Sequence, residues 1–145
     1  MKIEYQRGDI FKSPYRFILH GCNARGVMGA GFALQVKKMY PYAYKEYINN
    51  YEKKGLTLGE TQFVKCRDRT IINSITQQFY GKDGRRYVSY DAVANSMRMV
   101  EECLYGETIA MPKIGAGLAG GDWNVIESII ESELKTVQPI VFTLD

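Results

Sequence analysis

The sequence predicts an α/β domain in which helices cover a largely buried sheet. Six short apolar runs have the length of strands, and several are continuous and rich in Ile, Val and Phe, as in strands buried on both faces. Four further segments carry apolar residues at helical spacing. The chain closes with a strand–loop–helix–strand unit over Thr108–Leu144, and a parallel pairing there requires a right-handed crossover.

The predicted strands are spread along the whole chain, from its first residues to its last. With 145 residues, the chain has the length of one domain, and we expect one domain over residues 1–145. The strands are expected at Ile3–Tyr5, Phe17–Leu19, Gln62–Val64, Thr70–Ile75, Thr108–Met111 and Ile140–Leu144.

Each predicted helix has an apolar stripe and at least one residue that marks an end. Pro41 is expected to end the first helix and Gly55 the second. Ser89 or Asp91 would cap the start of the third helix, and Asp122 the start of the fourth. The four stripes span Phe32–Tyr40, Tyr44–Tyr51, Val93–Leu104 and Val125–Leu134.

Composition excludes several classes of protein. Hydrophobic residues make up 46% and charged residues 24%, and 19 basic against 16 acidic residues give a net charge of +3, which excludes a disordered chain. No apolar run reaches the length of a membrane span, and the N-terminus has no apolar signal region, so we expect no membrane partner and a cytoplasmic location. Three separated cysteines and one histidine predict no disulfide framework and no metal site.

The glycines gather in two clusters, each between a predicted strand and the following helix. Gly21, Gly26, Gly29 and Gly31 follow the second strand, and the fifth strand precedes Gly115, Gly117, Gly120 and Gly121. Ligands of open α/β sheets bind at this edge, where glycine lets backbone N–H groups approach a phosphate. Two such loops could hold a diphosphate between them, although each could also be only a tight turn.

Neither cluster fits a common nucleotide motif. The Gly26–Gly31 spacing matches a P-loop, but Phe32 and Ala33 stand where Lys and Ser or Thr are required. The run Gly115–Gly120 formally matches a dinucleotide-binding fingerprint, but it lies too near the end of the sequence for a second half to follow. The pattern therefore favours recognition of a dinucleotide-like ligand without hydride transfer.

Few polar side chains accompany these loops. Asp9 could accept hydrogen bonds from an adenine or a ribose, or act as a turn residue. His20 could serve as acid, base or nucleophile, or be a structural residue. Asn23 could orient a ribose or fix its loop through an Asx turn, and Asp122 could take part in chemistry or only cap a helix.

Four motifs in order, over essentially the whole chain, resemble the macro domain family. They are Gly8-Asp9-Ile10-Phe11, Leu19-His20-Gly21-Cys22-Asn23, Val27–Gln35 and Met111–Leu118 with Asp122-Trp123. Within that family, the chain looks most similar to the compact subgroup that includes ADP-ribose-1''-phosphate phosphatase and ADP-ribosyl glycohydrolases. The resemblance implies a three-layer α/β/α macro domain with a mixed central sheet, and ADP-ribose or a derivative as its partner.

The resemblance also implies a set of binding residues. Asp9 and Ile10 would hold adenine, Phe11 would be a further substrate-binding residue next to them, and Asn23 would contact the distal ribose. Asp145 and the two residues before it would lie near the adenine and its ribose. The diphosphate would be wrapped by two loops, which comprise Met28, Gly29, Ala30, Gly31 and Phe32, and Gly115, Ala116, Gly117 and Leu118. Ile114, directly before the second loop, is also expected to bind the substrate.

The chemistry within this subgroup varies, and the residues present favour a phosphatase. Glycohydrolases that act through a lysine carry it after a strand ending like Ile75-Thr76, where this chain has Gln77. Gln77 cannot form a Schiff base. The phosphatases resemble this chain at His20, Cys22 and Asn23. We therefore expect hydrolysis of ADP-ribose-1''-phosphate, with Asn23 positioning the distal ribose and His20 and Asp122 as acid, base or nucleophile.

Two alternatives stay open at this point. One is an ADP-ribosyl hydrolase that removes ADP-ribose from protein or nucleic acid by water attack at C1''. The other is a binding module for ADP-ribose without turnover. None of the three readings requires a cofactor.

Overall fold

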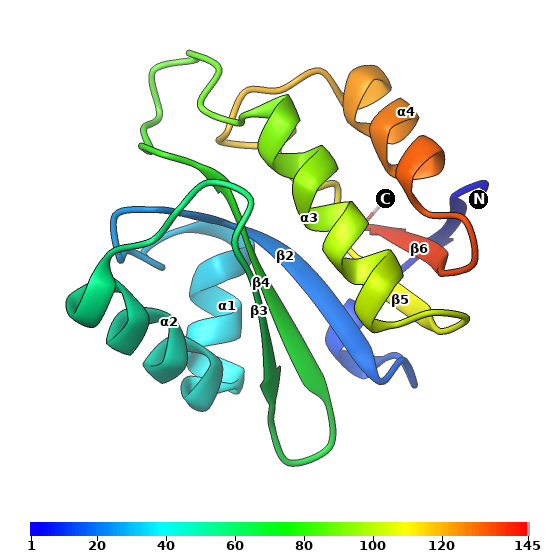
Figure 1. Cartoon of the computed structure of the whole chain (residues 1–145), viewed down its shortest axis with the longest axis horizontal. Coiled ribbons are helices and arrows are strands. Elements are labelled where there is room, and N and C mark those ends of the chain that lie inside the picture. The colour runs from blue at the N-terminus through cyan, green and yellow to red at the C-terminus, as the bar shows by residue number, and fades with distance from the viewer. Residues whose placement is uncertain (145) are drawn as a thin grey trace.

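The computed structural model describes residues 1–144, and these form a sheet of six strands between two pairs of helices (Figure 1). The strand order is β1-β6-β5-β2-β4-β3, and every neighbouring pair is parallel except β3 and β4. The predicted mixed sheet is confirmed. The strands are β1 (Glu4–Arg7), β2 (Phe17–Asn23), β3 (Thr61–Lys65), β4 (Thr70–Gln77), β5 (Thr108–Met111) and β6 (Gln138–Thr143).

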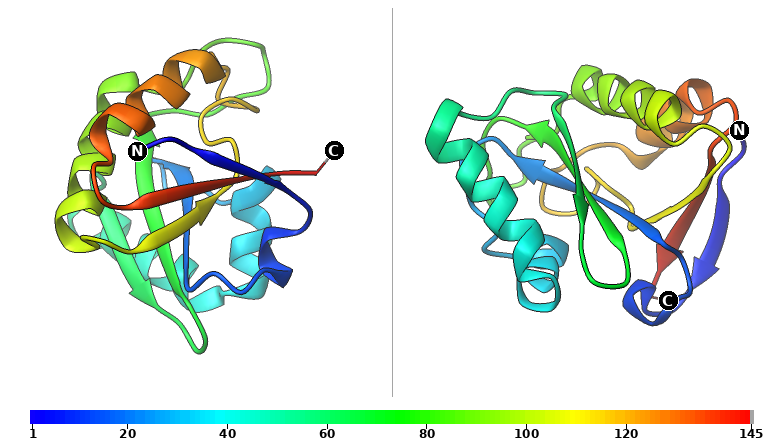
Figure 2. Two further views of the ribbon diagram at one scale, coloured as in Figure 1. Left: turned by 90° about the vertical axis from the view of Figure 1, so that its right-hand side faces the viewer. Right: turned by 60° about the horizontal axis from the view of Figure 1, so that its bottom comes forward.

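The helices lie in two layers, with α1 and α2 on one face of the sheet and α3 and α4 on the other (Figure 2). All four predicted helices are confirmed, and a short 3-10 helix, η1 (Ile10–Lys12), is added after β1. The α-helices are α1 (Gly31–Met39), α2 (Pro41–Lys54), α3 (Tyr90–Cys103) and α4 (Trp123–Glu133).

Local chemistry sets most of the helix ends. Ser89 and Asp122 cap α3 and α4 by accepting hydrogen bonds from the N–H groups of Ala92 and Asn124. Gly55, with φ of 76°, ends α2 in the left-handed region. Pro41 does more than end α1, because it also occupies the first turn of α2, where its missing N–H costs nothing.

Strand β2 extends further than the sequence predicts, and this changes the setting of His20 and Gly21. Both residues were expected at the start of the first glycine loop. Instead they lie inside the strand, opposite Asn73 and Ser74 of β4. Parallel pairing with β4 outweighs the weak strand preference of glycine, so the loop begins only after Asn23.

The core consists of apolar layers on both faces of the sheet. Side chains of β2, β4 and β5 pack against Met97 and Val100 of α3 and Ile126 and Ile130 of α4. On the other face, strand residues pack against α1 and α2. Within residues 1–144, no helix is long and apolar enough to cross a membrane.

Candidate functional site

An elongated cleft lies at the ends of β2, β5 and β6, where the chain leaves the sheet. It consists of two adjoining cavities of about 750 Å³ and about 340 Å³, and Phe32, Pro112 and Lys113 line both of them. The larger cavity is bounded by both glycine loops, and the smaller by the residues around Asp9 and Thr143. This position at a sheet edge is the one predicted from the glycine clusters.

The first glycine loop leads directly into α1. Gly29, Ala30 and Gly31 line the larger cavity, and Ala30 stands at the N-cap position, where it has no side chain to accept a hydrogen bond. The first-turn N–H groups of α1 therefore have no side-chain cap. Such a helix end carries partial positive charge and binds anions well.

Two glycines of the second loop, Gly115 and Gly117, have different structural roles. Gly115 has φ of 74°, a conformation that side chains other than glycine rarely adopt. Gly117 lies outside that region, and a Cβ built on it would meet nothing within 4 Å. Gly117 lines the larger cavity, so its missing side chain keeps the cavity open and is not required by the protein's own packing.

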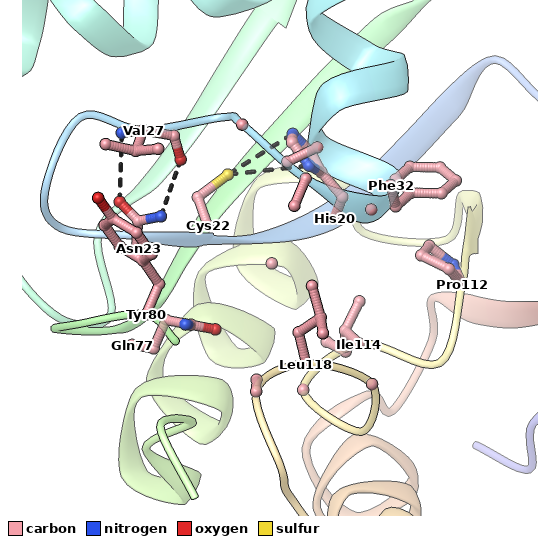
Figure 3. Close-up of a pocket in the computed structure, with 18 of the residues that line it drawn as sticks. His20, Cys22, Asn23, Val27, Phe32, Gln77, Tyr80, Pro112, Ile114 and Leu118 are labelled. Carbon is pink, nitrogen blue, oxygen red and sulfur yellow. Dashed lines mark hydrogen bonds between the residues drawn. The ribbon is translucent and has the colours of Figure 1, made fainter. Parts of the chain in front are cut away.

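Asn23 lines the cavity and also fixes the first loop. Its Oδ1 accepts a hydrogen bond from the N–H of Arg25 at 3.0 Å, which forms an Asx turn. The same oxygen accepts the hydroxyl of Tyr47 at 2.8 Å. Its Nδ2 donates to the carbonyl of Val27 at 2.8 Å (Figure 3). The loop-fixing alternative for Asn23 is thus confirmed, and its predicted contact with the distal ribose stays a prediction.

His20 is buried beneath the cavity, with 1% of its surface exposed. Its Nε2 lies 2.7 Å from Oδ1 of Asn73, whose Nδ2 donates to the carbonyl of Ala43. Nε2 is therefore the protonated nitrogen, and Nδ1 is left as an acceptor. Burial lowers the pKa of His20 to about 4, against an opposing effect of the Asn73 hydrogen bond, so the ring is neutral at pH 7.

The predicted carboxylates have separate positions. Asp9 lines the smaller cavity and accepts the N–H of Phe11 at 2.9 Å, which caps η1. Asp122 caps α4 and is not among the cavity-lining residues, so its role at a 1''-phosphate stays a prediction without a contact to support it. Asp145 lies outside the described residues.

Most of the other predicted binding residues come together at the cleft. Ile10 lines the smaller cavity, and Ile114 and Leu118 line the larger one. Three further predicted binding residues, Phe11, Met28 and Ala116, line neither cavity. Phe11 is buried with its ring stacked on Phe32 at 5.0 Å.

The cleft also has a wall that the sequence pattern did not predict. It comes from the segment that follows β4, of which Gln77, Tyr80, Gly81 and Lys82 line the larger cavity. In Figure 3, Gln77 and Tyr80 lie near Asn23 at one end of the cavity, and Phe32 and Pro112 at the other. In the sequence, the only signal for this wall is the run of aromatic and basic residues that follows a predicted strand.

The charges at the larger cavity are complementary to an anion. Lys82 and Lys113 line it, and no carboxylate does so within residues 1–144. In the same described part of the chain, no group of His, Cys, Asp and Glu side chains is arranged to hold a metal ion. The cavity can therefore bind a phosphorylated ligand through backbone N–H groups and two ammonium groups.

Comparisons with known proteins give this cleft a context. Residues 19–130 match the family model of the Macro domain. The ADP-ribose 1''-phosphate phosphatase of Meyerozyma guilliermondii is 30% identical over an alignment that covers 90% of this chain and 93% of that protein. The DNA ADP-ribosyl glycohydrolase of Thermus aquaticus is 27% identical over 143 residues, and the chain spans only 39% of its length.

Solved structures share the fold over nearly the full chain. A Bacteroides thetaiotaomicron protein of unknown function has 34% identity, a TM-score of 0.88 and 99% coverage of both chains. The macrodomain of DarG from Thermus aquaticus has 24% identity and a TM-score of 0.81, with 97% coverage of each chain. The expected three-layer α/β/α arrangement is confirmed.

Proposed function

The chain belongs to the macro domain family, and on that premise we propose that its cleft binds ADP-ribose and that it hydrolyses ADP-ribose-1''-phosphate. The products are ADP-ribose and inorganic phosphate. The relatives support this proposal, because they include a protein named as this phosphatase that matches over most of both chains.

The observation that carries the proposal is the open space at Gly117 opposite the uncapped start of α1. Both features belong to the larger cavity, and neither is explained by the protein's own packing. A diphosphate between them would accept hydrogen bonds from backbone N–H groups of both loops. Adenine would then lie in the smaller cavity beside Asp9 and Ile10, and the distal ribose beside Asn23.

His20 is the proposed base. Water would attack phosphorus, the P–O1'' bond would break, and its electron pair would go to O1''. The proton released by water would pass to Nδ1 of His20 and then to O1''. The neutral ring and the Asn73 contact support this assignment, because they leave Nδ1 unprotonated. Backbone N–H groups around Gly29 and Gly117 would stabilise the negative charge.

A second candidate function is removal of ADP-ribose from protein or nucleic acid. It is favoured by two exposed aromatic residues at the wall of the larger cavity, Tyr80, which lines it and is 54% exposed, and its neighbour Phe79, which is 57% exposed. Exposed aromatic rings beside a cavity can stack on a larger attached group. The relative named DNA ADP-ribosyl glycohydrolase is consistent with this candidate.

A comparison of substrates separates these candidates. Purified protein is given ADP-ribose-1''-phosphate, an ADP-ribosylated protein and ADP-ribosylated DNA, with His20→Ala as the variant. Phosphate release that falls by about a hundredfold or more in His20→Ala, with ADP-ribose affinity retained, supports the phosphatase. ADP-ribose release without phosphate release contradicts it and supports the second candidate. Binding without any product leaves a binding module.

A further inference from the structure

The wall of the larger cavity near Asn23 includes Tyr80, and the same segment carries a lysine, Lys82, that the proposed chemistry does not use. Lys82 belongs to the segment between β4 and α3 and lines the cavity together with Tyr80 and Gly81. The part of the cavity near Asn23 is where the distal ribose and its 1'' substituent would lie if ADP-ribose binds as proposed.

The segment that carries Lys82 is fixed against the second glycine loop. The N–H groups of Tyr87 and Val88 both donate to the carbonyl of Ala119, at 2.7 Å and 3.2 Å. The Tyr87 hydroxyl donates at 2.8 Å to the carboxylate of Asp83, the residue that follows Lys82 in the sequence. A Cβ on Gly120 would clash with the carbonyl oxygen of Arg85, so the two loops pack backbone against backbone. Lys82 therefore has a defined position relative to the diphosphate loop.

The neighbouring arginines already have partners. Arg85 forms an ion pair with Asp83 at 3.3 Å, and Arg25 and Arg86 lie over the rings of Phe79 and Tyr90. Lys82, by contrast, has no hydrogen bond or ion pair with any residue in the range 1–144. Its ammonium group is available to a ligand.

We propose that Lys82 is a specificity-determining residue that binds the phosphate at C1'' of ADP-ribose-1''-phosphate. This inference rests on the proposed function, because it assumes that ADP-ribose occupies the cleft. A lysine ammonium suits this task because it is a compact point charge with three donors. Lys82 acts through charge and hydrogen bonding, and forms no covalent bond to the ligand.

The test compares the affinities for ADP-ribose-1''-phosphate and ADP-ribose, measured by calorimetry in a His20→Ala background that slows turnover. Lys82→Ala is expected to weaken ADP-ribose-1''-phosphate binding by about tenfold, which is about 1.4 kcal/mol, and to change ADP-ribose binding by less than about twofold. Lys82→Arg keeps the charge and should restore most of the preference. The matched control is Arg85→Ala, which removes the same charge from the same segment outside the cavity.

The outcomes separate this inference from the proposed function. Equal losses in Lys82→Ala and Arg85→Ala would show a general charge effect and contradict a contact by Lys82. An unchanged preference for ADP-ribose-1''-phosphate over ADP-ribose in Lys82→Ala would also overturn the role of Lys82. So would a Lys82→Arg variant that binds ADP-ribose-1''-phosphate as weakly as Lys82→Ala does. In both cases, ADP-ribose binding by these variants would leave the proposed function standing. Absence of ADP-ribose binding in the wild-type protein would refute both.

Discussion

Nε2 of His20 lies 2.7 Å from Oδ1 of Asn73, and both side chains are almost completely buried between the sheet and the layer of α1 and α2. Asn73 is itself held by hydrogen bonds to the Ala43 carbonyl and to Gln62, both at 3.1 Å. This network fixes the His20 ring in one orientation and one tautomer. It links the floor of the cleft to α2 and to the edge strand β3.

The first prediction concerns stability at acidic pH. The pKa of His20 is lowered in the folded protein to about 4 from an ordinary value of 6.5, mainly by burial. The unfolded chain therefore binds a proton first as the pH falls. We expect the contribution of His20 to the free energy of unfolding to be fully present above about pH 6.5. Between about pH 6.5 and pH 4 this contribution should fall by roughly 3 kcal/mol in total.

The measurement is the free energy of unfolding in denaturant at several pH values, for the wild-type protein and for His20→Asn. The difference between the two isolates His20 from the carboxylates that titrate in the same range. A difference that does not change across pH 4 to 6.5 would contradict a buried neutral histidine.

The second prediction concerns the contact between Gly21 and Thr76. A Cβ on Gly21 would lie 2.8 Å from Oγ1 of Thr76, a buried hydroxyl oxygen without a hydrogen-bond partner within residues 1–144. Gly21→Ala should therefore lower the free energy of unfolding by about 1–3 kcal/mol through overpacking. In a Thr76→Ala background, the same substitution should cost much less, because the obstructing oxygen is gone.

A double-mutant cycle followed by denaturant unfolding checks this expectation. Thr76→Ala alone should have a small effect, since it removes an unpaired polar atom from the interior. Additive effects of the two substitutions would show that the space beside Gly21 is not limited by Thr76.

The third prediction separates the two roles considered for Asp122. As the N-cap of α4, Asp122 accepts the N–H of Asn124 at 2.9 Å. Asp122→Ala should cost about 1 kcal/mol of stability, whereas Asp122→Asn should retain most of it, because asparagine caps equally well. Thermal unfolding measures the cap. The rate of phosphate release by Asp122→Asn tests the catalytic role. Because Asp122 is not among the residues that line the larger cavity, we expect this rate to change little. A large loss of rate would show that Asp122 takes part in catalysis.

The sequence predicts the parts of the fold that local chemistry controls. Ser89, Asp122 and Gly55 mark helix ends through their own side chains or backbone freedom, so their predicted positions are confirmed. The setting of His20 could not be predicted in the same way. Its partner Asn73 is 53 residues away, and only the pairing of β2 with β4 brings them together.

The candidate site shows the same division. The glycine loops were predictable because glycine near a strand end carries its own signal. The wall formed by Tyr80, Gly81 and Lys82 was not, because that segment is placed by contacts of Tyr87 and Val88 with Ala119. Contacts between distant segments leave no local pattern in the sequence.

The central claim is that the two glycine loops hold the diphosphate of ADP-ribose, and calorimetry with ADP-ribose on Gly117→Glu tests it most directly. The added carboxylate enters open space, so the protein should fold normally while the negative charge repels the diphosphate. We expect at least about tenfold weaker binding, or about 1.4 kcal/mol. Asn49→Glu, an equal charge change on the exposed surface of α2, should bind like the wild-type protein. Equal affinities of Gly117→Glu and Asn49→Glu would contradict the claim.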